Sequence, residues 1–567
     1  MNHPNPAIVT QAAARRLPRV ALLLLCICYV LSGFVGREAW KSADITALGY
    51  MSELANGTSN WLRPTLAGLS TNFPALLPYW LGAGAIALAP PWVAADFAAR
   101  IPFGLLLAMA MLATWYATYY LARTPQAQPV AFAFGGEAKP KDYARAMADG
   151  ALLSLIASLG LAQLSHETTP AVAQLGFTAL LFFSLAALPY HRKISLVTVL
   201  VGLTGTTLSG APAMAVFFGL GGSLIHAFDQ GAPYEKNPKA TTTQRLIDSS
   251  FILLATVLGA FLALVMDLWR WKIELPRAQW QDWNGYAQLL IWFAWPAWPL
   301  ALWTVWRWRR QLFNSKISRH LGLPAWFALV TVAATLLTGS SDRTLLIALP
   351  SLATLAAFAL PTLKRQVAAL IDWFTLLFFS GCGFVIWVVW IAMQTGFPSQ
   401  PASNVARLAP GFTPSFSWWE FFVACAATMV WVWLVHWRVG RHRAAIWKSL
   451  VLPASGASLC WLLLMTLWMP LLNYGLGYTV LVNKAVALLE PRGCIQAVSL
   501  DPAKIAALQV YGHQRFGTEP GLCPWLVTDI ELEKREHDQP QNSTWAWHAE
   551  VEHPVDAKES LQILKRR

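Results

Sequence analysis

The sequence carries little charge. Charged residues make up 13% of its 567 residues, whereas 56% are hydrophobic. Too few polar side chains remain to cover a soluble globule of this size, so the composition excludes an ordinary soluble protein and predicts a polytopic membrane protein. The chain also lacks a Walker motif, a glycine-rich dinucleotide motif, an internal repeat and a low-complexity tract. These absences give no support for a nucleotide site.

Cysteine is also scarce, with seven residues in the chain. Five of them lie within apolar runs and are interpreted as packing residues: Cys26, Cys28, Cys382, Cys425 and Cys460. There is no Cys-x-x-Cys or histidine-rich spacing that would indicate a metal site. Cys494 and Cys523 lie in a polar tail, and a disulfide is the simpler interpretation if that tail lies outside the cytoplasm.

Long apolar runs dominate the rest of the chain. Thirteen of them are long enough to cross a hydrocarbon core of about 30 Å. They lie at about 17–36, 97–122, 146–164, 171–190, 194–209, 212–228, 249–268, 287–306, 322–339, 344–361, 369–395, 419–437 and 446–470. The apolar segment at 75–90 is short and flanked by prolines, so we interpret it as an interfacial helix and not as a further span.

The net charge of +13 comes from Lys and Arg residues scattered between the apolar runs. This pattern is typical of inner loops and of contact with anionic lipids, and it does not indicate nucleic-acid binding. With thirteen spans and the N-terminus in the cytoplasm, the basic clusters fall in inner loops. Arg15, Arg16 and Arg19 precede an apolar run without a cleavage site, which predicts an uncleaved first span.

An odd number of spans places the C-terminal tail outside. From about residue 471 the chain gains Asp, Glu, Lys, His and Gln and loses its apolar runs. We therefore predict a membrane domain over 1–470, with its first outer loop at 36–96, and a C-terminal domain over 471–567. The expected fold class is an all-α polytopic membrane protein with amphipathic interfacial helices in the first outer loop and a small C-terminal α/β domain.

Ionisable residues beside the outer membrane surface are costly unless they have a function or a partner. Asp44 begins an amphipathic segment over 45–54, just past the first span. The alternative role for Asp44 is a helix N-terminal residue favoured by the helix dipole. His166 and Glu167 lie in the tight outer turn between the third and fourth predicted spans. The alternative there is a polar turn that caps two helices.

Several cations are expected at the same surface. Arg343 follows Asp342 at the start of an apolar run, and its alternative role is an ion pair with that neighbour. Arg407 lies in the proline-rich outer loop 396–416, which has the length of a lid. Lys41, Arg63 and Arg100 complete the set, and the alternative for Arg100 is an ion pair with Asp96.

The first outer loop has an ordered set of motifs. Asp44 follows Ala39-Trp40 by about one turn, and Pro78-Tyr79-Trp80 and Ala99-Arg100-Ile101-Pro102 come later. This order resembles the first outer loop of the GT-C superfamily of membrane glycosyltransferases, above all the lipid A aminoarabinose transferases and the protein O-mannosyltransferases. Many members have Asp-Glu where this chain has Asp44-Ile45, and a lysine where it has Phe73 before Pro74. These departures leave a divalent metal and the donor sugar open.

The resemblance implies an inverting glycosyltransferase that moves a sugar from a polyprenyl-phosphate donor to lipid A, another envelope glycan or a protein. The reaction would occur at the periplasmic face of a bacterial inner (cytoplasmic) membrane, among membrane lipids. Asp44 would accept or orient the acceptor proton, and Glu167 would hold the sugar or the acceptor. The donor phosphate would contact Lys41, Arg343 and Arg407. The other expected substrate contacts are Arg63, Tyr79, Trp80, Arg100 and His166.

Two other functional classes remain open from the sequence. A transporter or flippase for a lipid or another amphiphile would have paired broken helices with ionisable groups near the bilayer midplane. Acidic residues within the apolar runs are few, which argues against it. An inactive envelope scaffold is the third class, because the first loop departs from the family pattern.

Overall fold

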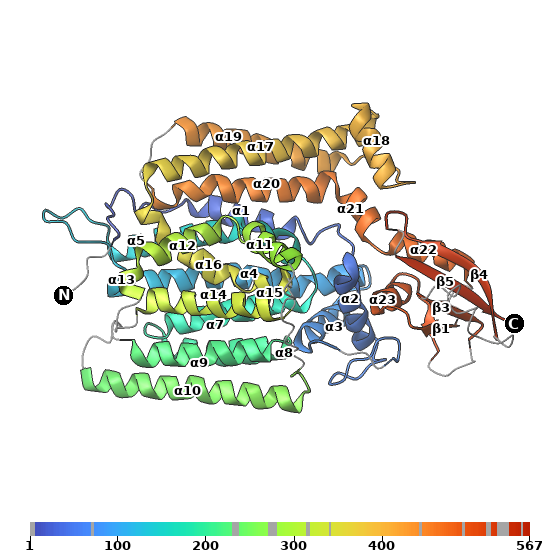
Figure 1. Cartoon of the computed structure of the whole chain (residues 1–567), viewed down its shortest axis with the longest axis horizontal. Helices are drawn as coiled ribbons and strands as arrows, with labels where there is room; N and C mark the ends of the chain where they lie inside the picture. The colour runs from blue at the N-terminus through green and yellow to red at the C-terminus, as the bar shows by residue number, and fades with distance from the viewer. Residues whose placement is uncertain are drawn as a thin grey trace.

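The computed structural model describes residues 6–69, 73–229, 238–269, 280–312, 318–338, 342–440, 445–489, 494–517, 523–529, 544–556 and 559–567. Most of the chain forms long helices that run side by side (Figure 1). The helices of this bundle are α1 (Arg19–Leu31), α4 (Ala95–Ala122), α5 (Pro140–Ala157), α6 (Leu159–Leu164), α7 (Pro170–Ala187), α8 (Arg192–Leu208), α9 (Pro212–Phe228), α10 (Pro238–Val265), α11 (Trp280–Phe293), α12 (Ala297–Arg307), α13 (Arg309–Leu312), α14 (Arg319–Leu337), α15 (Asp342–Leu346), α16 (Leu349–Ala359), α17 (Arg365–Thr395), α18 (Ser399–Leu408), α19 (Trp418–Gly440) and α20 (Val451–Leu467). Short 3-10 turns occur at η1 (Pro125–Ala127), η2 (Leu360–Thr362) and η3 (Ile446–Leu450).

The helices of the bundle are apolar enough for a membrane. Among the described residues, seven helices have the length and composition of a span, or eight if the bent pair α11 and α12 counts as one. The axes of that pair meet at 89°. The other predicted spans fall on shorter or interrupted helices, so the expected number of thirteen stays a prediction.

Local sequence fixes where several of these helices begin. α5, α7 and α9 each start at a proline, Pro140, Pro170 and Pro212. Proline suits the first helical position because its fixed φ matches the helix and its missing N–H would have no partner there. The turns before α7 and α9 lie at the same end of the bundle as α2 and α3 (Figure 1).

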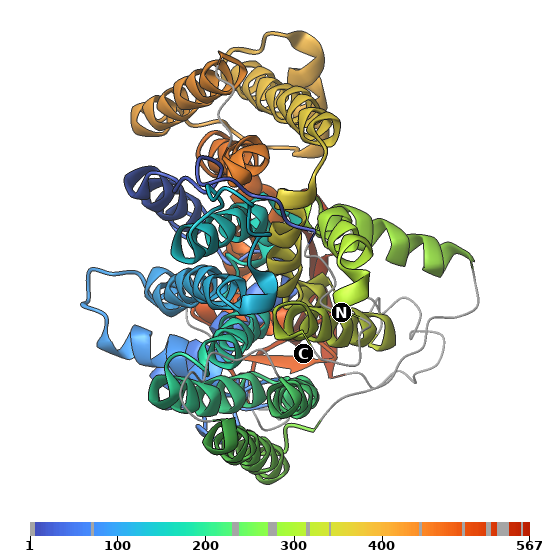
Figure 2. The same ribbon diagram turned by 90° about the vertical axis from the view of Figure 1, so that its left-hand side faces the viewer.

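The first outer loop forms two helices at that end, α2 (Lys41–Ala55) and α3 (Leu77–Leu88). They cover the predicted amphipathic segments, and they pack on one another through stacked rings of Tyr50 and Tyr79, whose centroids lie 5.0 Å apart. α17, α18 and α19 form a separate hairpin that packs mainly on α20 (Figure 2). The segment 396–416, expected as a loop, thus contains the helix α18.

The polar tail folds as a small α/β unit beyond α21 (Met469–Leu476) and α22 (Thr479–Leu488). Its elements are β1 (Cys494–Val498), α23 (Pro502–Val510), β2 (Arg515–Phe516), β3 (Trp525–Thr528), β4 (Trp545–Glu552) and β5 (Ser560–Arg566). The strand order is β2-β1-β3-β5-β4. β1 is parallel to β2 and β3, whereas β5 is antiparallel to β3 and β4. A disulfide joins Cys494 to Cys523, with Cα atoms 5.0 Å apart.

One hydrophobic core joins the bundle to this C-terminal unit. Leu153 of α5, Met51 of α2 and Ala506 of α23 belong to the same buried cluster. Gly49 of α2 lies so close to α23 that a Cβ at this position would be 2.7 Å from the Cβ of Ala506. α2 is therefore packed between the bundle and the C-terminal unit. The fold class expected from the sequence, helical membrane bundle with a small C-terminal α/β unit, is confirmed.

Candidate active site

Asp44 meets the turn between α6 and α7. Its Oδ1 accepts hydrogen bonds from the backbone N–H and the hydroxyl of Thr168, at 2.7 and 2.6 Å. Its Oδ2 accepts from Arg37 Nη2 at 3.1 Å and from the backbone N–H of Trp40 at 3.2 Å. The residue is 1% exposed. A carboxylate offers about four lone-pair positions, so these contacts use all of them.

Arg37, which was not among the residues predicted for the site, joins the two segments. Its Nη1 donates to the carbonyl oxygen of His166 at 2.9 Å, and its guanidinium lies 4.3 Å from the centre of the Trp40 ring. Arg100 donates to the Arg37 carbonyl oxygen, and its ion pair with Asp96 measures 3.5 Å. The sequence feature that could have identified Arg37 is its position directly after the first apolar run, where a charged side chain needs a partner.

Glu167 is the second carboxylate of the site and is 0% exposed. Its Oε2 accepts from Arg343 Nε and Nη2, at 3.1 and 2.9 Å. Its Oε1 is buried and has no hydrogen-bond partner. Burial, and then the charge of Asp44, raise the pKa of Glu167 above its ordinary value. The structure therefore brings Asp44, Glu167 and Arg343 together from α2, the α6–α7 turn and α15.

His166 has a packing role in this structure. Its Nδ1 contacts the carbonyl oxygen of Ala162, and its Nε2 lies 3.0 Å from the carbonyl oxygen of Tyr29. The ring packs against Trp461, with centroids 5.0 Å apart. A Cβ at Gly33 would lie 2.2 Å from the imidazole, so this position requires glycine. Burial lowers the pKa of His166 to about 4. Both ring nitrogens thus face carbonyl oxygens of the protein, and the substrate contact expected for His166 stays a prediction.

The remaining predicted residues divide into two groups. Tyr79 is buried against α2, and Trp80 Nε1 donates to the carbonyl oxygen of Trp61 at 2.7 Å, so both hold the first outer loop together. Arg63 and Arg407 are exposed. Arg407 lies on α18, in the hairpin that Figures 1 and 2 show apart from α2.

Lys41 begins α2, but its side chain lies outside the described residues. Within the part of the chain that the structure describes, no group of three or more His, Cys, Asp or Glu side chains could hold a metal ion. Glu167 and Asp44 are instead both paired with arginines.

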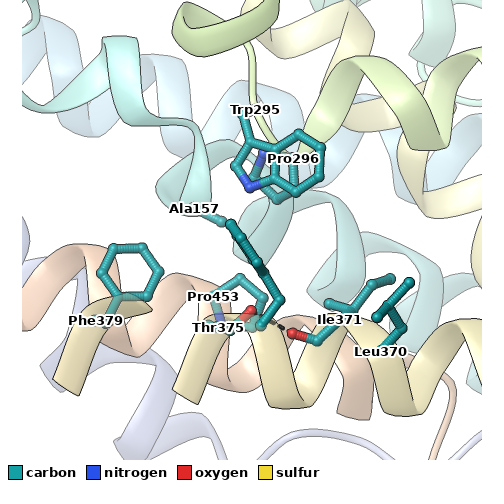
Figure 3. A pocket seen from close by; sticks show the side chains of 9 residues that line it. Ala157, Trp295, Pro296, Leu370, Ile371, Thr375, Phe379 and Pro453 are labelled. Carbon is teal, nitrogen blue, oxygen red and sulfur yellow. Dashed lines mark hydrogen bonds between the residues drawn. The ribbon is translucent and has the colours of Figure 1, made fainter. Parts of the chain in front are cut away.

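A cavity of about 180 Å³ lies at the break between α11 and α12. Trp295 and Pro296 at the break face residues of α17 across it (Figure 3). The lining residues are Ala157, Trp295, Pro296, Leu370, Ile371, Phe374, Thr375, Phe379 and Pro453. The hydroxyl of Thr375 bonds to its own helix at the carbonyl oxygen of Ile371, so the lining is apolar. Leu370 and Phe374 are 68% and 43% exposed on the bundle surface, where lipid would lie.

The cavity and the carboxylates are connected through α6. Ala157 lines the cavity at the end of α5, and the backbone N–H of Leu159 donates to the carbonyl oxygen of Trp295 at 3.1 Å. α6 then runs for six residues to the turn that carries Glu167. At 1.5 Å per residue, α6 itself spans roughly 9 Å of the path between the cavity and this turn.

The comparisons with known proteins concern the fold. No protein-family model and no curated protein sequence matches the chain. Among solved structures, ArnT from Cupriavidus metallidurans bound to undecaprenyl phosphate is similar, with a TM-score of 0.59, 13% identity, and coverage of 96% of this chain and 97% of that one. The apo state of the same protein gives a TM-score of 0.58 with the same identity and coverage. The chain therefore has the fold of ArnT over nearly its whole length, and the fold that its resemblance to the GT-C superfamily predicted is confirmed.

Proposed function

We propose that the protein is a glycosyltransferase that moves a sugar from a polyprenyl-phosphate donor to an acceptor at the outer membrane surface. The observation that carries this proposal is the pair of Glu167 and Arg343, in which one carboxylate oxygen is buried without a partner. The helix α6 connects the turn that carries Glu167 to an apolar cavity at the break between α11 and α12. A lipid-linked sugar needs these two environments at neighbouring depths. The bound undecaprenyl phosphate of ArnT supports the choice of donor class.

Arg343 is the proposed contact for the donor phosphate. Its side chain is 30% exposed, whereas Glu167 is completely buried. Two of its nitrogens bond to Glu167, and its planar guanidinium can turn its remaining N–H groups to a phosphate. The lipid chain would then pass along α6 toward Trp295 and the cavity. Burying a CH₂ group there is worth about 0.8 kcal/mol.

The reaction is a single displacement at the anomeric carbon. The acceptor hydroxyl gives its proton to Glu167 Oε1 while its oxygen forms the new bond to the anomeric carbon. The bond from that carbon to the phosphate oxygen breaks, and the negative charge that develops on the leaving lipid phosphate is held by Arg343. Attack from the face opposite the phosphate inverts the anomeric centre. The raised pKa of Glu167 suits a group that accepts a proton.

Asp44 has a different role in this proposal from the one expected from the sequence. Its carboxylate is already the acceptor of four hydrogen bonds, so it has no lone pair for an incoming hydroxyl. We assign it to positioning: it fixes Thr168, next to Glu167, and it neutralises Arg37. Arg100, which donates to the Arg37 backbone, supports the same segment.

The proposed setting is the inner membrane of a bacterium, with the N-terminus in the cytoplasm. The division into a membrane domain over 1–470 and a periplasmic domain over 471–567 belongs to the same proposal. α2, α3 and the C-terminal sheet gather at one end of the bundle, which would be the periplasmic face (Figure 1). Acceptors available at that face are lipid A, other envelope glycans and proteins.

A transporter is less well supported by these features. Such proteins have paired broken helices with ionisable groups at the break. Across the described residues one helix pair is bent in this way, and its break at Trp295 and Pro296 faces an apolar cavity.

The proposal is tested by measuring the transfer of labelled sugars from polyprenyl-phosphate donors. The assay uses liposomes that contain the protein and envelope acceptors. We expect Glu167→Gln to lower kcat by about 100-fold or more, the usual effect of removing a general base. Glu420→Gln is the matched control, because Glu420 lies in the first turn of α19, in the separate hairpin. Equal transfer by wild type and Glu167→Gln would show that Glu167 is not the base. If none of the donors supports transfer by the wild type, the glycosyltransferase proposal fails.

A further inference from the structure

The backbone from Gly36 to Trp40 is held by a single amide side chain from the far end of the chain. Asn473, in α21, accepts the N–H of Glu38 at 3.1 Å and Nε1 of Trp40 at 2.8 Å through the same oxygen. Its Nδ2 donates to the carbonyl oxygen of Gly36 at 3.1 Å. Trp40 also forms an isolated antiparallel bridge with Gly477. Three bonds from one amide fix the course of this segment.

The same segment contacts the C-terminal unit directly. The N–H of Ala39 donates to the hydroxyl of Tyr511, just beyond α23, at 3.2 Å. The hydroxyl of Thr479 donates to the Glu38 carboxylate at 2.7 Å. His553, which directly follows β4, lies with its Nε2 3.1 Å from the carbonyl oxygen of Gly477. The segment before α2 is therefore bonded to α21, α22 and the C-terminal unit at successive residues.

Trp40 connects the segment held by Asn473 to the candidate active site. It is 2% exposed, and the face of its ring lies under the guanidinium of Arg37. Its backbone N–H donates to Asp44. Arg37 in turn bonds to Asp44 and to the carbonyl oxygen of His166, the residue before Glu167. A shift of the Trp40 ring would move Arg37 and, through it, the turn that carries Glu167.

We propose that Asn473 is a positioning residue for the candidate active site, and that α21, through Asn473, sets the geometry of Arg37, Asp44 and Glu167. The inference rests on the proposed function for its effect on catalysis. Its structural part, the ordering of the segment 36–44 by Asn473, does not depend on which reaction the protein carries out.

The test compares Asn473→Ala with Gln509→Leu. Gln509 of α23 also bonds to α2, but at Glu53, near the end of the helix that lies away from Asp44. Both variants thus lose a side-chain contact between α2, or the segment before it, and the C-terminal part. We expect Asn473→Ala to lower kcat by about 10- to 100-fold, because small displacements at a reacting centre have effects of this size. KM for the lipid donor should stay within about threefold, since Arg343 and the cavity are untouched. Gln509→Leu should keep the wild-type kcat.

Amide hydrogen exchange, followed by mass spectrometry on peptides that cover 36–48, gives the second measurement. Exchange should become faster in Asn473→Ala and stay unchanged in Gln509→Leu. Wild-type exchange in Asn473→Ala overturns the inference, and so does faster exchange with an unchanged kcat. If the wild type transfers no sugar, the proposed function fails, while the exchange result still decides whether Asn473 orders this segment.

Discussion

Replacing Asp44 by Asn would distinguish a structural carboxylate from a reactive one. Four N–H and O–H groups donate to this carboxylate. An Asn amide keeps one accepting oxygen, and its NH₂ group cannot accept. Arg37 is affected most, because it is 2% exposed and would lose the charge that it pairs with. Removing one partner of a buried ion pair costs about 3–5 kcal/mol, and we expect Asp44→Asn to lower the free energy of unfolding by that amount.

Chemical unfolding of the purified variants in detergent measures this loss, and sugar transfer is compared at equal amounts of folded protein. Glu167→Gln is the matched variant, because the unpartnered Oε1 of Glu167 leaves room for an NH₂ group that meets no other donor. Its Oε2 can still accept from Arg343, so its free energy of unfolding should fall by only about 1 kcal/mol. Asp44→Asn should therefore lower mainly the free energy of unfolding, whereas Glu167→Gln should lower mainly the rate of sugar transfer.

A double variant tests whether the unpaired Arg37 causes the loss of stability in Asp44→Asn. Arg37→Met combined with Asp44→Asn removes the unpaired guanidinium, so it should unfold less easily than Asp44→Asn alone. If Asp44→Asn is as stable as the wild type but transfers no sugar, Asp44 takes part in the reaction and the assignment of the base to Glu167 is wrong.

Three further results are expected. Arg343→Ala should lower kcat by about 100-fold through the loss of phosphate stabilisation. Arg407→Ala, at an exposed position of α18, should leave donor kinetics unchanged. Similar losses in both variants would contradict the assignment of Arg343 as the phosphate contact. Burial lowers the pKa of His166 from 6.5 to about 4, so the unfolded chain binds a proton that the folded protein does not, and stability should fall as pH drops through this interval. A His166→Gln variant measured by pH-dependent unfolding should lack that component. Cys523→Ser should lower the free energy of unfolding of the C-terminal unit by about 3 kcal/mol. Limited proteolysis should then cleave the C-terminal unit faster while the bundle stays intact. Unchanged cleavage would show that the bond to Cys494 does not stabilise this unit.

The sequence predicted which residue types would gather at the site. Asp44, Glu167 and Arg343 each lie beside an apolar run, where an ionisable group needs a partner or a function, and the structure brings all three together. The same logic did not distinguish their roles. The partners of Asp44 include Thr168, 124 residues away in the chain, and no local pattern shows that this contact uses its lone pairs.

Hydropathy did not predict the bend within the run 287–306 or the position of Arg407 around the bundle. The apolar run at 287–306 was expected as one span, but the chain bends by 89° there and forms one wall of a cavity. Arg407 has the charge expected of a phosphate contact, but it lies on a hairpin that packs mainly on α20. The sequence shows which ionisable residues lie beside apolar runs, but it does not show where around the bundle each of them lies.

The contact between Asn473 and Glu38 also has a consequence for the order of biogenesis. The two residues are 435 positions apart. At about 5–20 residues per second, a ribosome needs roughly 20–90 s to make the chain between them. During that interval the first helices are already synthesised, but the segment that carries Arg37 has no amide to hold it. The segment that carries Arg37 can be fixed only after α21 has been synthesised, so a chain released early from the ribosome would leave a bundle with an unformed site.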